Sequence, residues 1–293
     1  MTYETASFFI IFSKNPNPDP LCTFGPQNTR IVNFLKQMLR RWYRSIPRNE
    51  DGSLSWGRYF RRLVLRLVLW FFGITIGFTL LYAFLPVPCT PLMFIRCFEQ
   101  AAEADRDVRW VKDWVPMTEL SPKLQLAVVC AEDQEFLEHE GFDFAAIEKA
   151  YKYNRTHKRK RGASTISQQT AKNTFLWPAR SWIRKGLEVY FTFLIELIWS
   201  KERIMTVYLN IIEFGDGIYG AEAAARHYYN KAAKDLSTSE AAMLAAILPN
   251  PLKRSPKNPS SEVRHRQQWI ISQMRMWGGK IDFDEPNTPK KEK

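Results

Sequence analysis

Cysteine and histidine are scarce in this chain, which has four of each among its 293 residues. The cysteines show neither a CxxC spacing nor the pairing with histidine that is typical of zinc sites. Cys22 lies before a long apolar run, and Cys130 lies within an apolar segment where a thiol behaves as a small hydrophobic side chain. Cys89 and Cys97 remain as a pair that could form a disulfide, so no disulfide framework defines the fold.

Several catalytic motifs are also missing. The sequence contains no HExxH, GxSxG, P-loop or Ser-x-x-Lys. Their absence argues against zinc metalloproteases, α/β-hydrolases, P-loop nucleotidases and penicillin-binding transpeptidases. The paired ExxH motifs that a di-iron helix bundle needs are missing too.

Charge is absent from residues 67–85, which read LVLWFFGITIGFTLLYAFL. A helix of this length is roughly 28 Å long, close to the ~30 Å hydrocarbon core of a bilayer. The run lies far from the N-terminus and ends in Pro86-Val87-Pro88 without a cleavage pattern, which favours an uncleaved anchor over a signal peptide. Arginines cluster before the run and acidic residues follow it, so the positive-inside rule places the N-terminus in the cytoplasm.

The sequence therefore predicts four parts. Residues 1–62 form a basic, largely disordered cytoplasmic segment, 63–88 the transmembrane anchor, 89–280 a large outer domain and 281–293 a polar tail. With a formal charge of +12, the chain suits anionic partners. Because the large domain is expected outside the cytoplasm, lipid head groups and pyrophosphates are favoured over nucleic acid.

The outer domain reads as mostly α-helical. Capping residues and apolar periodicity predict helices over 121–132, 143–153, 164–173, 202–209, 221–229, 241–248 and 262–276. They also predict a long helix whose apolar stripe covers 187–198. Residues 152–161 are a charged loop, either a solvated connector or a flap near an anionic ligand. Aromatic and basic residues alternate over 175–185, which favours contact with a bilayer surface over ordinary packing.

Two polar stretches carry the chemistry. Glu132 ends an apolar helix close to Phe136 and His139, where partial burial would raise its pKa towards use as an acid or base; a solvated helix end is the alternative. Residues 161–173 offer hydroxyls, amides and an ammonium group, which can bind sugar hydroxyls and phosphate oxygens together. A polar helix facing solvent is the alternative for this second stretch.

These stretches belong to an ordered set of five motifs in which the chain resembles the peptidoglycan glycosyltransferases, family 51 of the glycosyltransferases, and most closely their monofunctional biosynthetic transglycosylases. The motifs are Glu132-Asp133-x-x-Phe136-x-x-His139-x-Gly141; Gly162-Ala163-Ser164-Thr165-Ile166-Ser167-Gln168-Gln169 with Lys172-Asn173; Arg184-Lys185-x-x-Glu188 to Ser200-Lys201 and Tyr208-Leu209-Asn210; Phe214-Gly215 to Gly220 with Ala223-Ala224; and Glu240-Ala241-Ala242 to Pro249-Asn250-Pro251. The resemblance covers nearly all of residues 86–279. Glu135 replaces a common basic residue and Ala163 a common glycine, and neither change removes a proposed catalytic group.

The resemblance implies a lysozyme-like helical head with a small membrane-associated jaw. It also implies polymerisation of lipid II, with the growing glycan strand as donor, at the bacterial inner membrane. By the family pattern Glu132 is the general base and Glu188 the second acidic site residue. Asp133, Phe136 and His139 support the base. The expected substrate-binding residues are Ser164, Thr165, Gln168, Gln169, Lys172, Asn173, Arg180 and Arg184.

Alternatives stay open at this level. No cofactor is expected to be obligatory, and Mg²⁺ held by Glu188 is the open option. A membrane-bound lytic glycosidase of lysozyme-like fold is the rival enzyme, but a hydrolase has no pyrophosphate for the basic residues to neutralise. An anchored scaffold without activity is a more distant reading. Cross-linking is expected to come from partners, such as penicillin-binding transpeptidases and divisome proteins.

Overall fold

The computed structural model describes residues 37–38, 41, 47, 49, 55–103, 107–157, 162–179, 181–279 and 281–283. Arg180, Cys22, most of the N-terminal segment, residues 158–161 of the charged loop and the end of the polar tail lie outside these ranges. The chain divides into two units, Met1–Gly73 and Ile74–Lys293. The boundaries predicted for the four parts remain predictions.

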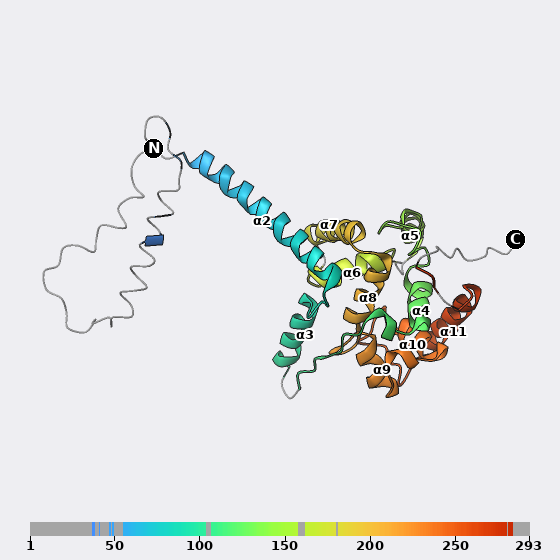
Figure 1. The fold of residues 1–293 in the computed structure, drawn as a ribbon. Helices are drawn as coiled ribbons and strands as arrows, with labels where there is room; N and C mark the ends of the chain where they lie inside the picture. The colour runs from blue at the N-terminus through green and yellow to red at the C-terminus, as the bar shows by residue number, and fades with distance from the viewer. Residues whose placement is uncertain are drawn as a thin grey trace, which may run out of the picture. The chain divides into compact units, whose positions relative to one another are not determined.

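The described residues are mostly helical, as predicted (Figure 1). The helices are α2 Trp56–Phe84, α3 Pro91–Ala102, α4 Pro122–Glu132, α5 Phe144–Thr156, α6 Ile166–Phe175, α7 Trp182–Ile198, α8 Lys201–Ile211, α9 Ala221–Tyr229, α10 Thr238–Ile247 and α11 Ser261–Met276, with short 3-10 turns at Met117–Glu119 and Ala233–Asp235. Three short strands, β1 Val111–Lys112, β2 Glu213–Gly215 and β3 Ile218–Tyr219, form a sheet in the order β1-β3-β2. The sequence did not predict these strands.

Helix α2 is long and apolar enough to cross a membrane, with a mean hydropathy of 2.1 over its most apolar window. It begins eleven residues before the uncharged run, so its first turns carry Arg58, Arg61, Arg62 and Arg66. Its side chains are almost all exposed, which suits a helix that faces lipid. The described part of the chain thus holds one candidate membrane-spanning helix, which is consistent with a membrane-anchored protein.

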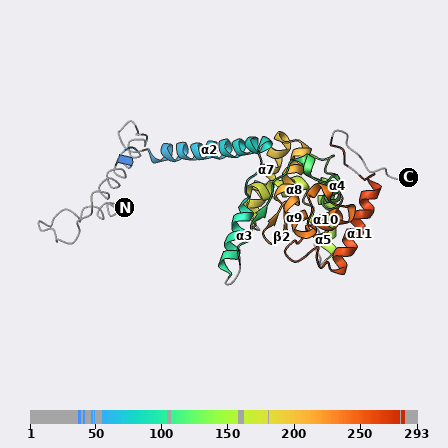
Figure 2. The same ribbon diagram turned by 60° about the horizontal axis from the view of Figure 1, so that its bottom comes forward.

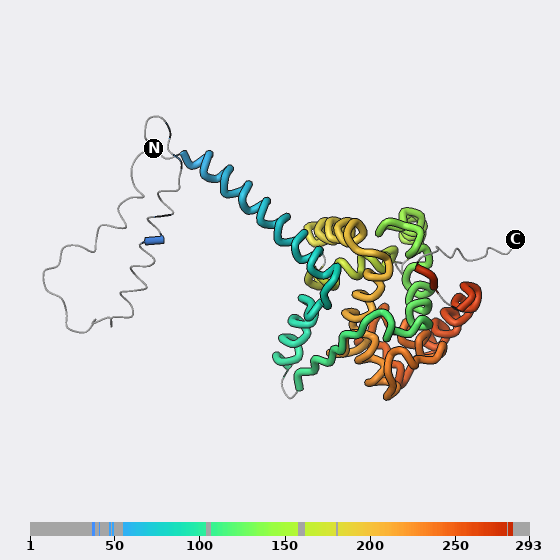
Figure 3. Tube along the Cα trace, in the orientation of Figure 1, coloured from blue at the N-terminus to red at the C-terminus, as the bar shows by residue number. Residues whose placement is uncertain are grey.

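Two groups of helices build the second unit. Helices α4, α10 and α11 pack together, and α6 packs against α7 and α8 (Figures 1 and 3). Figure 2 shows α3 and α11 at opposite sides of this unit. Helix α10 is apolar on all sides and entirely buried from Ala241 to Ile247, so it forms the centre of the core.

Hydrogen bonds fasten the end of α2 within the second unit. The indole nitrogen of Trp199 donates to the carbonyl oxygen of Thr79 at 2.8 Å, and the guanidinium of Arg203 donates to that of Tyr82 at 2.7 Å. Arg203 also reaches the carbonyl oxygen of Leu85, which places a positive charge at the C-terminus of the helix. The last turns of α2 are therefore held firmly within the second unit.

The segment 175–185 contains both buried and strongly exposed apolar residues. Phe175 and Leu176 pack in the core, Phe175 stacking on Phe191 at 4.5 Å between ring centroids, so the prediction of an interfacial role is wrong for these two residues. Trp182 and Ile183 are 91% and 78% exposed. Along α7 they continue into an exposed apolar stripe made of Val189, Phe193 and Leu197, which suits contact with lipid.

Cys89, Cys97 and Cys130 are free thiols in the described part of the chain. Burial raises the pKa of the Cys130 thiol to about 12, as expected for a small apolar core residue. Ser121 lies at the N-cap of α4 as predicted, but its hydroxyl makes no capping hydrogen bond.

Candidate active site

Glu132 is the last residue of α4, and its side chain is only 14% exposed. One carboxylate oxygen accepts a hydrogen bond from the amide of Gln169 at 3.0 Å, and the other from Arg266 at 3.1 Å. Burial is the main cause of a raised pKa of Glu132; the nearby Asp133 charge adds to it, while Gln169 and Arg266 oppose it. The carboxyl group therefore combines a small exposed surface with a raised proton affinity.

Asp133 and His139 hold the segment around Glu132 in place. The backbone NH of Gly141 donates to Nδ1 of His139 at 3.0 Å, so Nε2 carries the ring proton and donates to the Asp133 carboxylate at 3.0 Å. The same carboxylate accepts from the backbone NH of Ile166, the first residue of α6, at 2.9 Å. A negative charge there also suits the positive end of the helix dipole. Asp133 thereby locks α6 next to Glu132.

Helix α6 then delivers Gln169 and Lys172. The hydroxyl of the fully buried Tyr208 donates to the amide oxygen of Gln169 at 3.3 Å. Burial raises the pKa of Tyr208 well above its usual value, so the hydroxyl stays a donor. Because Tyr208 binds the amide oxygen, the amide nitrogen of Gln169 faces Glu132.

Lys172 is half-buried, and its ammonium group makes no hydrogen bond or ion pair with any residue that the structure describes. Burial lowers its pKa; Arg184 and Lys185 add to this, and Glu188 and Glu132 oppose it. A half-buried cation that lacks a partner favours the binding of an anion.

Three residues of α7 complete a cluster with Lys172, which we call the cationic cluster: Lys172, Arg184, Lys185 and Glu188. Glu188 is buried, and its two oxygens bind Arg184 at 2.6 Å and Lys185. The Nε of Arg184 is buried without a hydrogen-bond partner in the described structure. Three positive charges around one carboxylate leave the cluster with a net positive charge.

The other predicted residues have different surroundings. Thr165 and Gln168 form a capping box at the start of α6, and the Thr165 hydroxyl also donates to the carbonyl oxygen of Gly141 at 2.7 Å. These two buried side chains thus have a structural task that the sequence analysis did not assign to them. Phe136 is fully buried beneath the ammonium of Lys201, 4.9 Å from its ring centroid. Ser164 and Asn173 make no side-chain hydrogen bond within the described structure.

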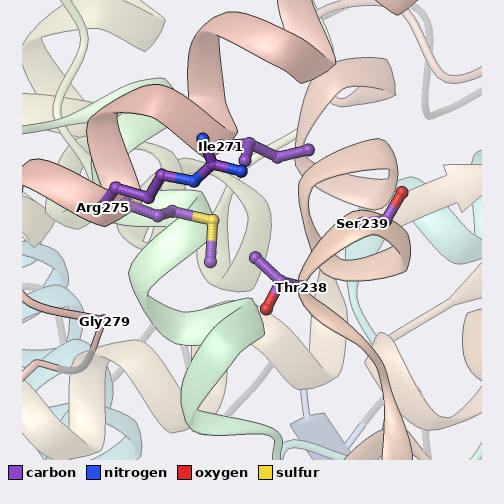
Figure 4. Close-up of a pocket in the computed structure, with 6 residues that line it drawn as sticks. Thr238, Ser239, Ile271, Arg275 and Gly279 are labelled. Atoms are coloured by element: carbon purple, nitrogen blue, oxygen red, sulfur yellow. The ribbon is translucent and has the colours of Figure 1, made fainter.

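A cleft of about 1070 Å³ opens beside Glu132. The described residues that line it come from the end of α4, from α5, from the loop before α6 and from the region of Pro249 and α11: Ala131, Glu132, Asp133, Gln134, Glu135, Asp143, Ala146, Lys149, Tyr153, Gly162, Ala163, Ser164, Thr165, Gln169, Pro249, Arg266 and Trp269. A smaller pocket of about 370 Å³ lies between α10 and the end of α11 (Figure 4). None of its described lining residues is a carboxylate, so it offers no comparable base.

Arg266 is a site residue that the sequence analysis missed. It lies 134 positions after Glu132, on the final helix and outside the motifs used for the resemblance. The described residues contain no group of three or more His, Cys, Asp or Glu side chains that could hold a metal ion.

Comparison with known proteins identifies the family of the chain. A family model described as "Transglycosylase" matches residues 100–275. The chain is similar to proteins named "Biosynthetic peptidoglycan transglycosylase" from three bacteria. It is 56% identical to that of Yersinia pseudotuberculosis over 82% of this chain and 98% of the relative. It is 56% identical to that of Cronobacter sakazakii over 75% and 91%, and 55% identical to that of Bdellovibrio bacteriovorus over 73% and 85%.

A match of this extent shows that the chain belongs to the transglycosylase family and is a glycosyltransferase.

Proposed function

We propose that this glycosyltransferase polymerises lipid II into β-1,4-linked glycan strands of peptidoglycan and releases undecaprenyl pyrophosphate. One observation carries the proposal: the partly buried Glu132 lines a saccharide-sized cleft, and its charge acts on the unpaired ammonium of Lys172. A sugar linked to a pyrophosphate has both features that such a site recognises. The printed names of the relatives support peptidoglycan as the product.

In the proposed step Glu132 takes the proton from the 4-hydroxyl of the acceptor GlcNAc. The hydroxyl oxygen forms a bond to C1 of the donor MurNAc, and the bond from C1 to the pyrophosphate oxygen breaks, so the leaving group departs with the electron pair. Attack from the face opposite the α-linked pyrophosphate inverts C1 and gives the β linkage. Lys172 and Arg184 stabilise the negative charge that develops on the leaving group, and Arg180 is proposed to join them.

The residues fit a divalent cation poorly. Mg²⁺ prefers carboxylate oxygens together with water and substrate phosphates, whereas both oxygens of Glu188 are already paired with Arg184 and Lys185. We therefore assign charge stabilisation to the basic side chains and derive no step through a metal.

The anchor sets the location in this proposal. With the N-terminus in the cytoplasm, α2 would cross the inner membrane and hold the catalytic unit at its outer face, where lipid-linked substrate is presented. The exposed stripe of α7 would dip into the same bilayer. Cross-links between strands would be made by partner transpeptidases, with divisome proteins as further partners.

The test is an assay of the full chain in vesicles with two substrates, lipid II and polymeric peptidoglycan. We expect glycan strands from lipid II, no release of fragments from the polymer, and a rate that persists when a chelator is added. Fragments from the polymer without strand formation would favour the lytic glycosidase instead.

The pH dependence tests the environment of Glu132. The base must be ionised, so activity rises with pH through the pKa of Glu132 and forms the acid limb of the pH profile. Because this pKa is raised, the acid limb lies at a higher pH than an ordinary carboxyl group would give. Arg266 favours the ionised form, so Arg266→Gln is expected to raise the pKa further and to move the acid limb of kcat/KM to higher pH. Arg264→Gln is the control, because Arg264 lies on the same helix but binds the carbonyl oxygen of Pro259. An acid limb that stays in place or moves to lower pH in Arg266→Gln would contradict the assignment.

A further inference from the structure

Trp269 is a large aromatic side chain in the wall of the cleft. It is 46% exposed although it lies in the middle of α11, and it makes no hydrogen bond or ring contact with any described residue. Its neighbours Ile270 and Val263 on the same helix are buried in the core. The indole is therefore only partly covered by the fold, and one of its surfaces faces the cleft.

The cleft has room for more than the reacting sugar. Its volume of about 1070 Å³ is at or above the upper end of the range of about 300–1,000 Å³ that holds drug-sized ligands. Tyr153 and Lys149 of α5 line it as well as Trp269 of α11. A wall with aromatic surface and a few polar groups is typical of sites that bind amphipathic rings such as sugars.

The positions of the charged residues indicate how a bound donor would be oriented in the cleft. Among the described residues that line the cleft, none belongs to the cationic cluster, although the charge of Lys172 acts on Glu132. Arg266, which binds Glu132, lies three residues before Trp269, so one turn of α11 leads from the base to the indole. A donor whose pyrophosphate lies at the cationic cluster would thus extend its sugars along the cleft towards Trp269.

We propose that Trp269 is a binding residue for the glycan strand, stacking on a pyranose ring of the donor beyond the MurNAc that reacts. This inference rests on the proposed function and assigns a saccharide subsite within it. A flat ring that contributes surface without a fixed hydrogen bond holds successive sugars equally well. Such a contact lets the strand slide by one disaccharide after each addition.

The test separates sugar binding from pyrophosphate binding in the full chain. Two probes are used: a tetrasaccharide pyrophosphate on a short prenyl chain, and the prenyl pyrophosphate without sugar. Trp269→Ala is expected to weaken binding of the first by about three- to tenfold, the range for loss of one aromatic stacking contact, and to leave the second unchanged. Trp269→Phe keeps an aromatic ring and should restore most of the affinity for the tetrasaccharide pyrophosphate. In strand synthesis from lipid II, Trp269→Ala should make shorter strands.

Met276→Ala is the matched control, because Met276 is exposed on the same helix and does not line the cleft. Equal affinity of Trp269→Ala and the original chain for the tetrasaccharide probe, or equal weakening for both probes, would overturn the subsite. Failure of the original chain to form strands from lipid II would instead refute the proposed function, so the two failures are distinguishable.

Discussion

Glu132→Gln is expected to reduce strand formation from lipid II by about a thousandfold, within the range of about 10² to 10⁴ that a general base contributes. The amide keeps the shape of the carboxyl group, and its one oxygen can still accept a hydrogen bond from either Gln169 or Arg266, but it cannot accept the proton of the attacking hydroxyl. Binding of the tetrasaccharide pyrophosphate should therefore change little. Initial rates with labelled lipid II and direct binding of the tetrasaccharide probe measure the two effects separately.

The fold should survive this change. The pKa of Glu132 is raised in the folded chain, because folding disfavours the ionised form of its carboxyl group. The contribution of Glu132 to the stability of the fold therefore falls as the pH rises through that pKa. A neutral amide avoids this cost at neutral pH, and we expect no loss of thermal stability. Glu138→Gln is the control, since Glu138 is exposed on the same segment and does not line the cleft. A Glu132→Gln variant within tenfold of the original rate would remove Glu132 from the proposed mechanism.

Local signals predicted the helices well. Ser237 and Glu240 have the sequence spacing of a capping box and form one in the structure, and α9 spans the predicted residues 221–229. Both signals depend on residues only a few positions apart, so the backbone alone satisfies them. The start of α6 was placed two residues early, because Thr165 is the N-cap and α6 begins at Ile166.

Contacts between distant segments could not be predicted in this way. Arg266 reaches Glu132 only because α4, α10 and α11 pack together, and no spacing along the chain encodes that contact. The sheet escaped prediction for the same reason, since β1 pairs with β3 across more than a hundred residues. Gly217 permits this approach: its φ is +68°, and a Cβ there would lie 2.2 Å from the carbonyl oxygen of Arg109.

The polar run 161–173 shows why the residue types in a sequence do not by themselves determine the role of each side chain. It was expected to bind substrate, yet Thr165 and Gln168 use their side chains to cap α6, whereas Gln169 turns to the base and Lys172 stays unpaired. The four residues stand at i, i+3, i+4 and i+7, so they lie on one face of α6 and differ in their distance from its start. That difference appears only when the start of the helix is known.

Lys172→Ala is expected to lower the rate with lipid II by about 10²- to 10³-fold, the usual cost of removing one group that stabilises developing negative charge. The reason lies in the surroundings of its ammonium: it is half-buried, its pKa is lowered mainly by burial, and no described side chain neutralises it. An anionic leaving group is the partner that this arrangement lacks. The variant should also bind prenyl pyrophosphate more weakly, which Trp269→Ala should not.

Lys152→Ala provides the control, because Lys152 is an exposed lysine paired with Glu148 on α5 and does not line the cleft. Lys172→Arg keeps the charge and should retain much of the affinity for prenyl pyrophosphate, while losing part of the rate because the larger group fits the half-buried position less well. A loss of less than tenfold in Lys172→Ala would show that the remaining basic residues suffice. Full recovery of that variant on addition of Mg²⁺ would assign the charge stabilisation to a metal, against the pairing of Glu188 with Arg184 and Lys185.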